Sequence, residues 1–171
     1  NKVSRAATNL NVVESLSFFD AYFIWSHSIA EKLQEDGCNK VIYLPFGYDE
    51  IHHVSNKISI QNYTKGLAFI GSWDKEREDL LTQLAGIDVN VNIYGNGWSG
   101  AARSFPFRSS ISPGSVFGQD MSAIMASSAV CLNPLRAQNK GAHNMRTFET
   151  PAMGGLMLTS RTEVQQGFFP E

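Results

Sequence analysis

The sequence predicts an α/β protein with a Rossmann-like parallel sheet that carries helices on both faces. Short unbroken apolar runs alternate with amphipathic segments along the chain, as they do where a parallel sheet is buried on both sides. Glycines follow several of the apolar runs, where a strand would turn into a helix. The 171 residues are 43% hydrophobic and 18% charged, which suits a globular chain with a sizeable core.

The first part of the chain contains one strand–helix–strand pattern. These three elements are predicted over residues 21–25, 29–36 and 41–44. Gly37 is expected to end the helix as its C-cap. Residues 48–65 are polar and irregular, so we place a domain boundary or linker there. The predicted domains are residues 1–60 and residues 61–171.

A longer series of strands and helices follows. Its strands are predicted over residues 67–70, 89–94, 129–133 and 156–159, and its helices over residues 75–84, 119–126 and 145–154. Residues 99–115 are rich in Ser, Gly and Pro and are expected to form a long loop. By helical periodicity, the side chains that face the core are expected to be Leu80, Leu81 and Leu84 in the first helix, and Met145, Phe148 and Ala152 in the last.

The residues directly after each predicted strand are candidates for a binding site, because ligands of such sheets bind outside the carboxyl ends of the strands. Small residues there let a ligand approach the backbone, and Tyr94 and Trp98 offer flat faces for a base. For any single loop, a tight turn with core aromatics is the commoner explanation. Agreement among residues 71–73, 94–98, 133–136 and 139–160 favours one shared site over four unrelated turns.

The stretch NKGAHNMRTFETPAMGGLMLTS, residues 139–160, contains the most specific candidates. Asn144 or His143 can cap a short helix whose free amides would favour an anion such as a diphosphate. Arg146 adds a positive charge, and Glu149 can accept hydrogen bonds from ribose hydroxyls. The spacing of this pair is explained equally well by an ordinary surface salt bridge.

Composition excludes several function classes. The formal net charge of -2 gives no basic field for nucleic acid, and no apolar run is long enough to span a bilayer. Cys38 and Cys131 form neither a disulfide framework nor a zinc motif, which makes a reduced, cytoplasmic setting the default. His52 and His53 are adjacent, so their side chains are expected to point apart, and we predict no metal site.

One loop combines aromatic and basic residues: Trp98, Arg103, Phe105, Phe107 and Arg108. An ordinary packed loop is the commoner explanation of this composition. Contact with a membrane-linked acceptor is the alternative.

Taken together, these segments resemble a known enzyme family. The runs CLNPLR, GAHNMRTFETPAMGGLMLTSRTE and FFPE look like the C-terminal, nucleotide-sugar-binding half of GT-B glycosyltransferases of group 1. The most similar group is the spore-maturation-protein-like one. FIGSW and IYGNGW fall where that group has its two glycine loops, and residues 23–49 are similar to the end of the N-terminal domain in family 4 retaining enzymes. The resemblance covers residues 19–171.

The resemblance implies specific roles at matching positions. Glu149 matches the second glutamate of the family's Glu-x7-Glu element, which holds the donor ribose, whereas Gly141 stands at the position of the first glutamate. Arg77 matches a basic position that helps hold the pyrophosphate. The complete expected donor-binding set is Gly71, Ser72, Arg77, Tyr94, Gly95, Gly97, Trp98, Asn133, Gly141, Ala142, His143, Asn144, Arg146 and Glu149.

The resemblance also implies a function: transfer of a sugar from a nucleotide-diphosphate sugar to a carbohydrate, lipid-linked or protein acceptor. The expected setting is cell-surface or spore polysaccharide synthesis in the cytoplasm, or at the inner face of the membrane by peripheral contact. No cofactor, metal or nucleic acid is expected. The chain would be the donor-binding half with the end of the N-terminal domain, truncated at its C-terminus, and the catalytic base would lie in the rest of that N-terminal domain. The alternative is a non-catalytic nucleotide-binding or interaction module, and an epimerase on the same fold has no residue in its favour.

Overall fold

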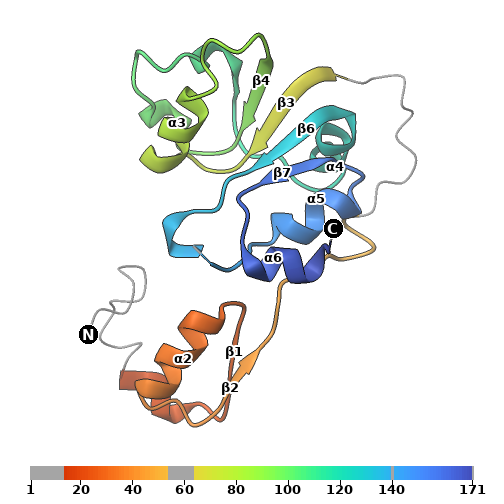
Figure 1. Ribbon diagram of the computed structural model, residues 1–171. Helices are drawn as coiled ribbons and strands as arrows, with labels where there is room; N and C mark the ends of the chain where they lie inside the picture. Colours follow the sequence, from red (N-terminus) through yellow and green to blue (C-terminus); the bar gives the residue numbers. More distant parts are fainter. Residues whose placement is uncertain (1–13, 54–63, 140, 171) are drawn as a thin grey trace. The chain divides into compact units, whose positions relative to one another are not determined.

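The computed structural model describes residues 14–53, 64–139 and 141–170, and the chain divides into two compact units (Figure 1). The first unit combines the chain up to Phe46 with Ala137–Asn144 and Arg161–Glu171. The second combines Gly47–Arg136 with Met145–Ser160. The predicted boundary between residues 60 and 61 falls outside the described residues. None of the helices in the described ranges is both long and apolar enough to cross a membrane.

The first unit contains the predicted strand–helix–strand pattern. Strands β1 (Tyr22–Ile24) and β2 (Val41–Tyr43) pair in parallel, and α2 (His27–Glu35) connects them. Helix α2 ends as expected, because Gly37 adopts the left-handed φ of 98° and the next amide, that of Cys38, donates to the Leu33 carbonyl at 2.9 Å. This unit also contains the short helices η2 (Leu16–Phe18) and η6 (Ala137–Asn139), and α6 (Glu163–Phe168), which the sequence analysis did not predict.

The second unit is built on a five-stranded parallel sheet. Its spatial order is β5-β4-β3-β6-β7, so the strand order reverses between β3 and β6. In a doubly wound sheet this reversal opens a crevice at the carboxyl ends of the two central strands. The strands are β3 (Thr64–Ile70), β4 (Asn90–Tyr94), β5 (Ile111–Ser112), β6 (Ser128–Asn133) and β7 (Met157–Thr159).

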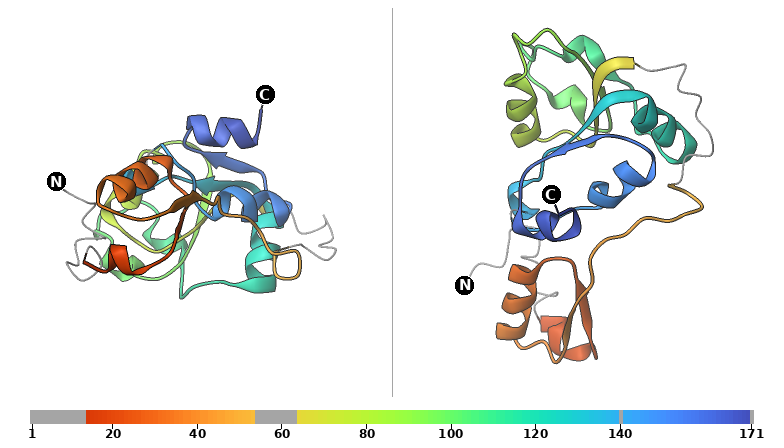
Figure 2. Two further views of the ribbon diagram at one scale, coloured as in Figure 1. Left: turned by 90° about the horizontal axis from the view of Figure 1, so that it is seen from below. Right: turned by 45° about the vertical axis from the view of Figure 1, so that its right-hand side comes forward.

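Helices cover both faces of this sheet, as predicted. Strand β3 directs Phe69 to one face and Ala68 to the other, because successive side chains of a strand alternate. Helix α3 (Lys75–Thr82) covers the Phe69 face with Leu81, whereas α4 (Gly118–Ser127) and the end of α5 (Arg146–Ala152) cover the Ala68 face with Met125 and Met153. Figures 1 and 2 show α3 on one side of the strands and α4 with α5 on the other. The molecule is therefore an α/β protein with a separate core on each face of the sheet.

The predicted loop over residues 99–115 is interrupted by secondary structure. It contains two 3-10 turns, η4 (Trp98–Gly100) and η5 (Arg108–Ser110), and then strand β5. Strand β5 has only two residues, which pair with the end of β4. A two-residue strand carries no detectable period, so pattern reasoning could not find it.

Two predicted inward-facing side chains lie at the surface instead. Leu80 is 37% exposed and Met145 is 52% exposed. In α3 the buried side chains are Glu78 and Leu81, which lie three positions apart on one face. In α5 the buried face begins with Thr147, so Met145 points to solvent. In α3 only Leu80 was predicted wrongly, because Leu81 is buried and Leu84 packs against the same core. In α5 the buried residues are Thr147, Glu149 and Thr150, so the predicted inward face was wrong there.

Candidate functional site

The loops after β3 and β4 are joined into one surface at the carboxyl edge of the sheet. The amide of Gly71 donates to the Tyr94 carbonyl at 2.8 Å, and the amide of Trp73 donates to the Asn96 carbonyl at 2.7 Å. Gly95 has a φ of 143°, and a Cβ built on it would lie 2.2 Å from the Gly71 carbonyl oxygen. Only glycine permits this approach, so the two glycine loops that the sequence analysis identified form a single structure.

The buried side chain of Trp98 stabilises these loops. Its side chain is 2% exposed, and its indole N–H donates to the Gly71 carbonyl at 2.9 Å. The ring stacks on Phe105 with centroids 5.6 Å apart and meets Phe69 edge-on. The prediction that Trp98 offers a flat face to a base is therefore wrong, because the ring is buried in the core. Phe105 is buried in the same cluster, which confirms the packed-loop interpretation for these aromatic rings.

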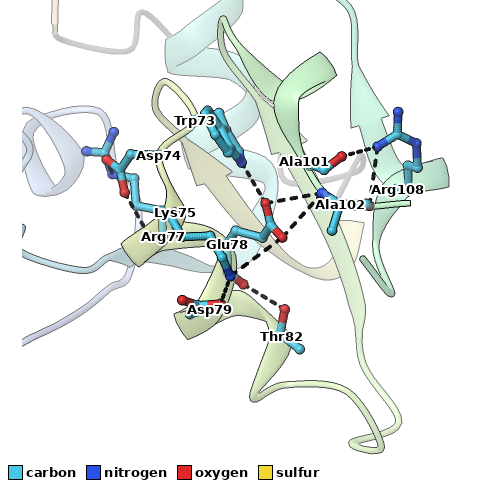
Figure 3. Close-up of polar contacts among 10 residues, drawn as sticks. All are labelled: Trp73, Asp74, Lys75, Arg77, Glu78, Asp79, Thr82, Ala101, Ala102 and Arg108. Carbon is cyan, nitrogen blue, oxygen red and sulfur yellow. Dashed lines mark hydrogen bonds and ion pairs between the residues drawn. The ribbon is translucent and has the colours of Figure 1, made fainter. Parts of the chain in front are cut away.

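A buried carboxylate, which sequence reasoning missed, ties α3 to these loops (Figure 3). Glu78 is 4% exposed, and it accepts hydrogen bonds from the Trp73 indole at 2.8 Å and from the Ala102 amide at 3.3 Å. Arg108 adds a further bond to the same segment, donating to the Ala101 carbonyl at 2.6 Å. Charged helix residues usually face water, so no local pattern distinguished Glu78 from its neighbours.

Two arginines meet where the strand order reverses. Arg77 belongs to the segment after β3, and Arg136 belongs to the segment after β6. Asp74 caps α3 by accepting from the Arg77 amide at 2.9 Å. Its other oxygen, Oδ2, lies 2.7 Å from Nε of Arg136 and 3.7 Å from Nε of Arg77. Arg77 also donates from Nη1 to the Ser72 carbonyl at 2.7 Å, so its guanidinium lies beneath the β3 loop. Arg136 was not in the predicted donor-binding set, although it follows β6 and the sequence analysis had named that loop.

The electrostatic environment of Arg77 reveals a cluster of like charges. Burial lowers the pKa of the Arg77 guanidinium below its ordinary value, and the positive charges of Arg136 and Arg146 lower it further. Asp74 opposes these effects but does not outweigh them. The carboxyl edge thus brings the guanidinium groups of Arg136 and Arg146 near the partly buried one of Arg77, with Asp74 and Glu149 as their carboxylate partners.

Glu149 lies buried beside this cluster. It is 7% exposed, and Arg146 forms an ion pair with its Oε2. On the other oxygen, Oε1, the Nε2 atom of His53 lies at 3.6 Å. Arg146 and Glu149 therefore pair as their spacing suggested, but the burial of Glu149 distinguishes this pair from an ordinary surface salt bridge.

Helix α5, which carries Arg146 and Glu149, is short and begins differently from the prediction. Its N-cap residue is Met145, which makes no side-chain capping bond. His143, one of the two predicted caps, is fully buried in the first unit, and its Nε2 accepts from the Phe46 amide at 3.0 Å. Burial lowers the pKa of His143, as does the nearby His27. His143 therefore serves packing within the first unit.

The other predicted residues of this region divide between the two units. Gly141, Ala142 and Asn144 belong to the first unit, where Gly141 is exposed with a φ of 83° and Ala142 is buried. Asn133 belongs to the second unit, and its buried amide donates to the Thr159 hydroxyl at 3.3 Å, joining the ends of β6 and β7. The second unit alone thus brings together Gly71, Ser72, Arg77, Tyr94, Gly95, Gly97, Arg146 and Glu149 at one edge of its sheet.

The adjacent histidines point apart, as the sequence analysis expected. His52 is exposed and lies 3.1 Å from Asp49 Oδ1, whereas His53 turns toward Glu149. Within the described ranges, no group of three or more ligating side chains could hold a metal ion.

A family model described as glycosyl transferase-like matches residues 75–171, which is more than half of the chain. The chain belongs to this family. The match begins at the first residue of α3 and includes Arg77, Arg136, Arg146 and Glu149. Neither a curated protein nor a solved structure matches the chain. Membership makes glycosyl transfer the general function, and this reaction requires a sugar donor and an acceptor.

Proposed function

We propose that the second unit binds the nucleotide-diphosphate sugar of a GT-B glycosyltransferase. The observation that carries this proposal is the set of three guanidinium groups, those of Arg77, Arg136 and Arg146, at the carboxyl edge of a Rossmann-like sheet. Like charges held together away from water destabilise one another, and a diphosphate relieves that repulsion. Asp74 and Glu149 hold the arginines in place in the absence of such an anion.

Each part of the edge has a role in this proposal. The arginines bind the diphosphate, and the loop of Gly71 and Ser72 lets the donor approach the backbone. Glu149 accepts hydrogen bonds from the ribose hydroxyls, and Tyr94, at the end of β4, lies where a base would be contacted. When the sugar is transferred, the nucleoside diphosphate leaves with added negative charge. Fixed guanidinium groups that stabilise this charge lower the barrier to transfer.

The remaining partners of the reaction are also proposals. The acceptor is a carbohydrate, lipid or protein, and the setting is cell-surface or spore polysaccharide synthesis in the cytoplasm or at the inner face of the membrane. The group that deprotonates the acceptor is expected in the acceptor-binding domain of the enzyme, not among the donor-binding residues of this unit.

A non-catalytic nucleotide-binding module is the second candidate, and Gly141 favours it. This glycine stands where the family's first glutamate is expected, and its φ of 83° is a conformation that a glutamate adopts only with strain. The two candidates differ in chemistry rather than in binding. Release of free sugar from the bound donor, or its transfer to an acceptor, favours the enzyme; binding without either reaction favours the module.

Calorimetric titration with nucleoside diphosphates tests the proposal. Arg136→Gln should weaken uridine, guanosine, adenosine and thymidine diphosphates to about the same extent, roughly 10- to 100-fold, because the lost charge contacts phosphate. Lys75→Gln is the matched control, since it removes the same charge from an exposed side chain of α3. Glu149→Gln should weaken ribonucleotides more than 2′,3′-dideoxy analogues. Absence of binding by all four diphosphates at millimolar concentration contradicts the proposed function.

A further inference from the structure

His53 is held in a fixed orientation beside Glu149. Its Nδ1 accepts a hydrogen bond from the Asp49 amide at 2.8 Å, and its own amide donates to the Asp49 carbonyl at 2.8 Å. The Asp49 carboxylate accepts from the amides of Ile51 and His52, which closes the turn over residues 49–53. The ring is therefore anchored by a compact local turn on one side and faces Glu149 on the other.

The anchoring bond also selects the tautomer of His53. A neutral imidazole carries one proton, and the nitrogen that accepts a hydrogen bond cannot carry it. Because Nδ1 accepts from the Asp49 amide, the proton is assigned to Nε2, the atom that lies 3.6 Å from Glu149 Oε1. The Nε2–H group thus lies beside a buried carboxylate oxygen, at a separation slightly longer than that of a hydrogen bond.

Arg146 and His53 act on different oxygens of Glu149. The terminal torsion of a glutamate is broad, so a single contact leaves the carboxylate plane free to turn. Arg146 pairs with Oε2, and Nε2 of His53 lies 3.6 Å from Oε1, so each oxygen has a polar neighbour that restricts the turning of the plane. A carboxylate offers about four acceptor positions, so about two remain after these contacts, which is the number that a vicinal diol requires.

We propose that His53 is a positioning residue that orients the Glu149 carboxylate to accept both hydroxyls of a ribose. This inference rests on the proposed function and adds a residue from the segment before β3, which the sequence analysis had treated as a linker. His53 acts through Glu149 and does not touch the phosphates. Its removal should therefore change the preference for ribose and leave the affinity for a sugar without these hydroxyls unaltered.

The test compares a ribonucleoside diphosphate with its 2′,3′-dideoxy analogue on the full chain. His53→Asn keeps an acceptor near the Nδ1 position, and so keeps the turn, but lacks the donor that faces Glu149. In this variant the ratio of the affinity for the ribose ligand to that for the dideoxy ligand should fall roughly 3- to 10-fold, with the affinity for the dideoxy ligand unchanged. His53→Gln places an amide N–H near the Nε2 position and should restore the preference. His52→Gln, at the exposed neighbouring position, is the matched control and should behave as the unmodified protein does.

The outcomes separate this inference from the proposed function. If the unmodified protein binds no nucleoside diphosphate, the proposed function fails and the inference fails with it. If it prefers ribose, and Glu149→Gln removes that preference while His53→Asn does not, the site stands and the role of His53 is refuted. Equal losses for the ribose and dideoxy ligands would also refute it, since they indicate a purely structural role. Without ligand, nitrogen-15 spectra should show the Nε2–H tautomer of His53, and an Nδ1–H tautomer contradicts the inference.

Discussion

Replacing Gly95 by alanine tests whether the two glycine loops are packed as closely as the structure has them. The φ of 143° at Gly95 is strained for any residue with a side chain and costs about 1–3 kcal/mol. The new methyl carbon would also lie 2.2 Å from the Gly71 carbonyl oxygen and 2.6 Å from its carbon. Those backbone atoms must shift, and overpacking of this kind costs about 1–3 kcal/mol more.

Gly86→Ala is the matched control for Gly95→Ala. Gly86 has a φ of 92°, but nothing lies within 4 Å of a Cβ built there. Gly86→Ala therefore measures backbone strain without the clash. Gly95→Ala should lower the free energy of unfolding by about 1–3 kcal/mol more than Gly86→Ala does.

The assay is urea unfolding followed by tryptophan fluorescence. A Trp25→Phe background leaves Trp73 and Trp98 as reporters, both of which lie in the second unit. Equal losses of stability for Gly95→Ala and Gly86→Ala would refute the close approach of the two loops.

Two further predictions concern buried titratable groups. Glu78→Gln should lower the free energy of unfolding by about 1.5–3 kcal/mol, because the bonds from Trp73 and Ala102 then meet a neutral group, and unchanged urea unfolding would contradict this role. The pKa of His143 is lower in the folded protein than in the unfolded chain, so the unfolded chain binds the proton at a higher pH. The stability that His143 supports is therefore present above about pH 6.5 and is lost as the pH falls below that value. His143→Gln keeps an acceptor for the Phe46 amide and should flatten the pH dependence of melting between pH 7.5 and 5; an unchanged slope would show that another group titrates.

Much of the fold could be predicted because the necessary signals are local. The apolar runs within β3 and β6 are continuous, β4 has apolar residues at alternate positions, and glycines after β3 and β4 mark turns, so a parallel sheet with its ligand edge follows from short segments. Helices α3 and α4 were found by their composition and period. Strand β5 and helix α6 were missed, because elements of two and six residues are too short to show a period.

The candidate site could be predicted only where a residue's position along the chain decides its place. Arg77 and Arg146 each lie near the start of a helix that follows a strand, and such positions lie at the carboxyl edge in any sheet of this type. Arg136 was missed because its contact with Asp74 joins segments that follow different strands. The segment before β3 was interpreted as a linker because its polar composition does not reveal that His53 turns toward Glu149.

The sequence by itself determined that this is an α/β chain whose glycine loops, arginines and Glu149 converge on one edge of a parallel sheet. Only the tertiary structure decided which side chains are buried away from solvent. Trp98 is buried in the core with its ring stacked on Phe105, and Glu78 and Glu149 are buried although glutamates normally remain exposed. The physical reason is that burial depends on which distant segments pack together. A repeating pattern within one segment sets its secondary structure but does not identify the atoms that will cover it.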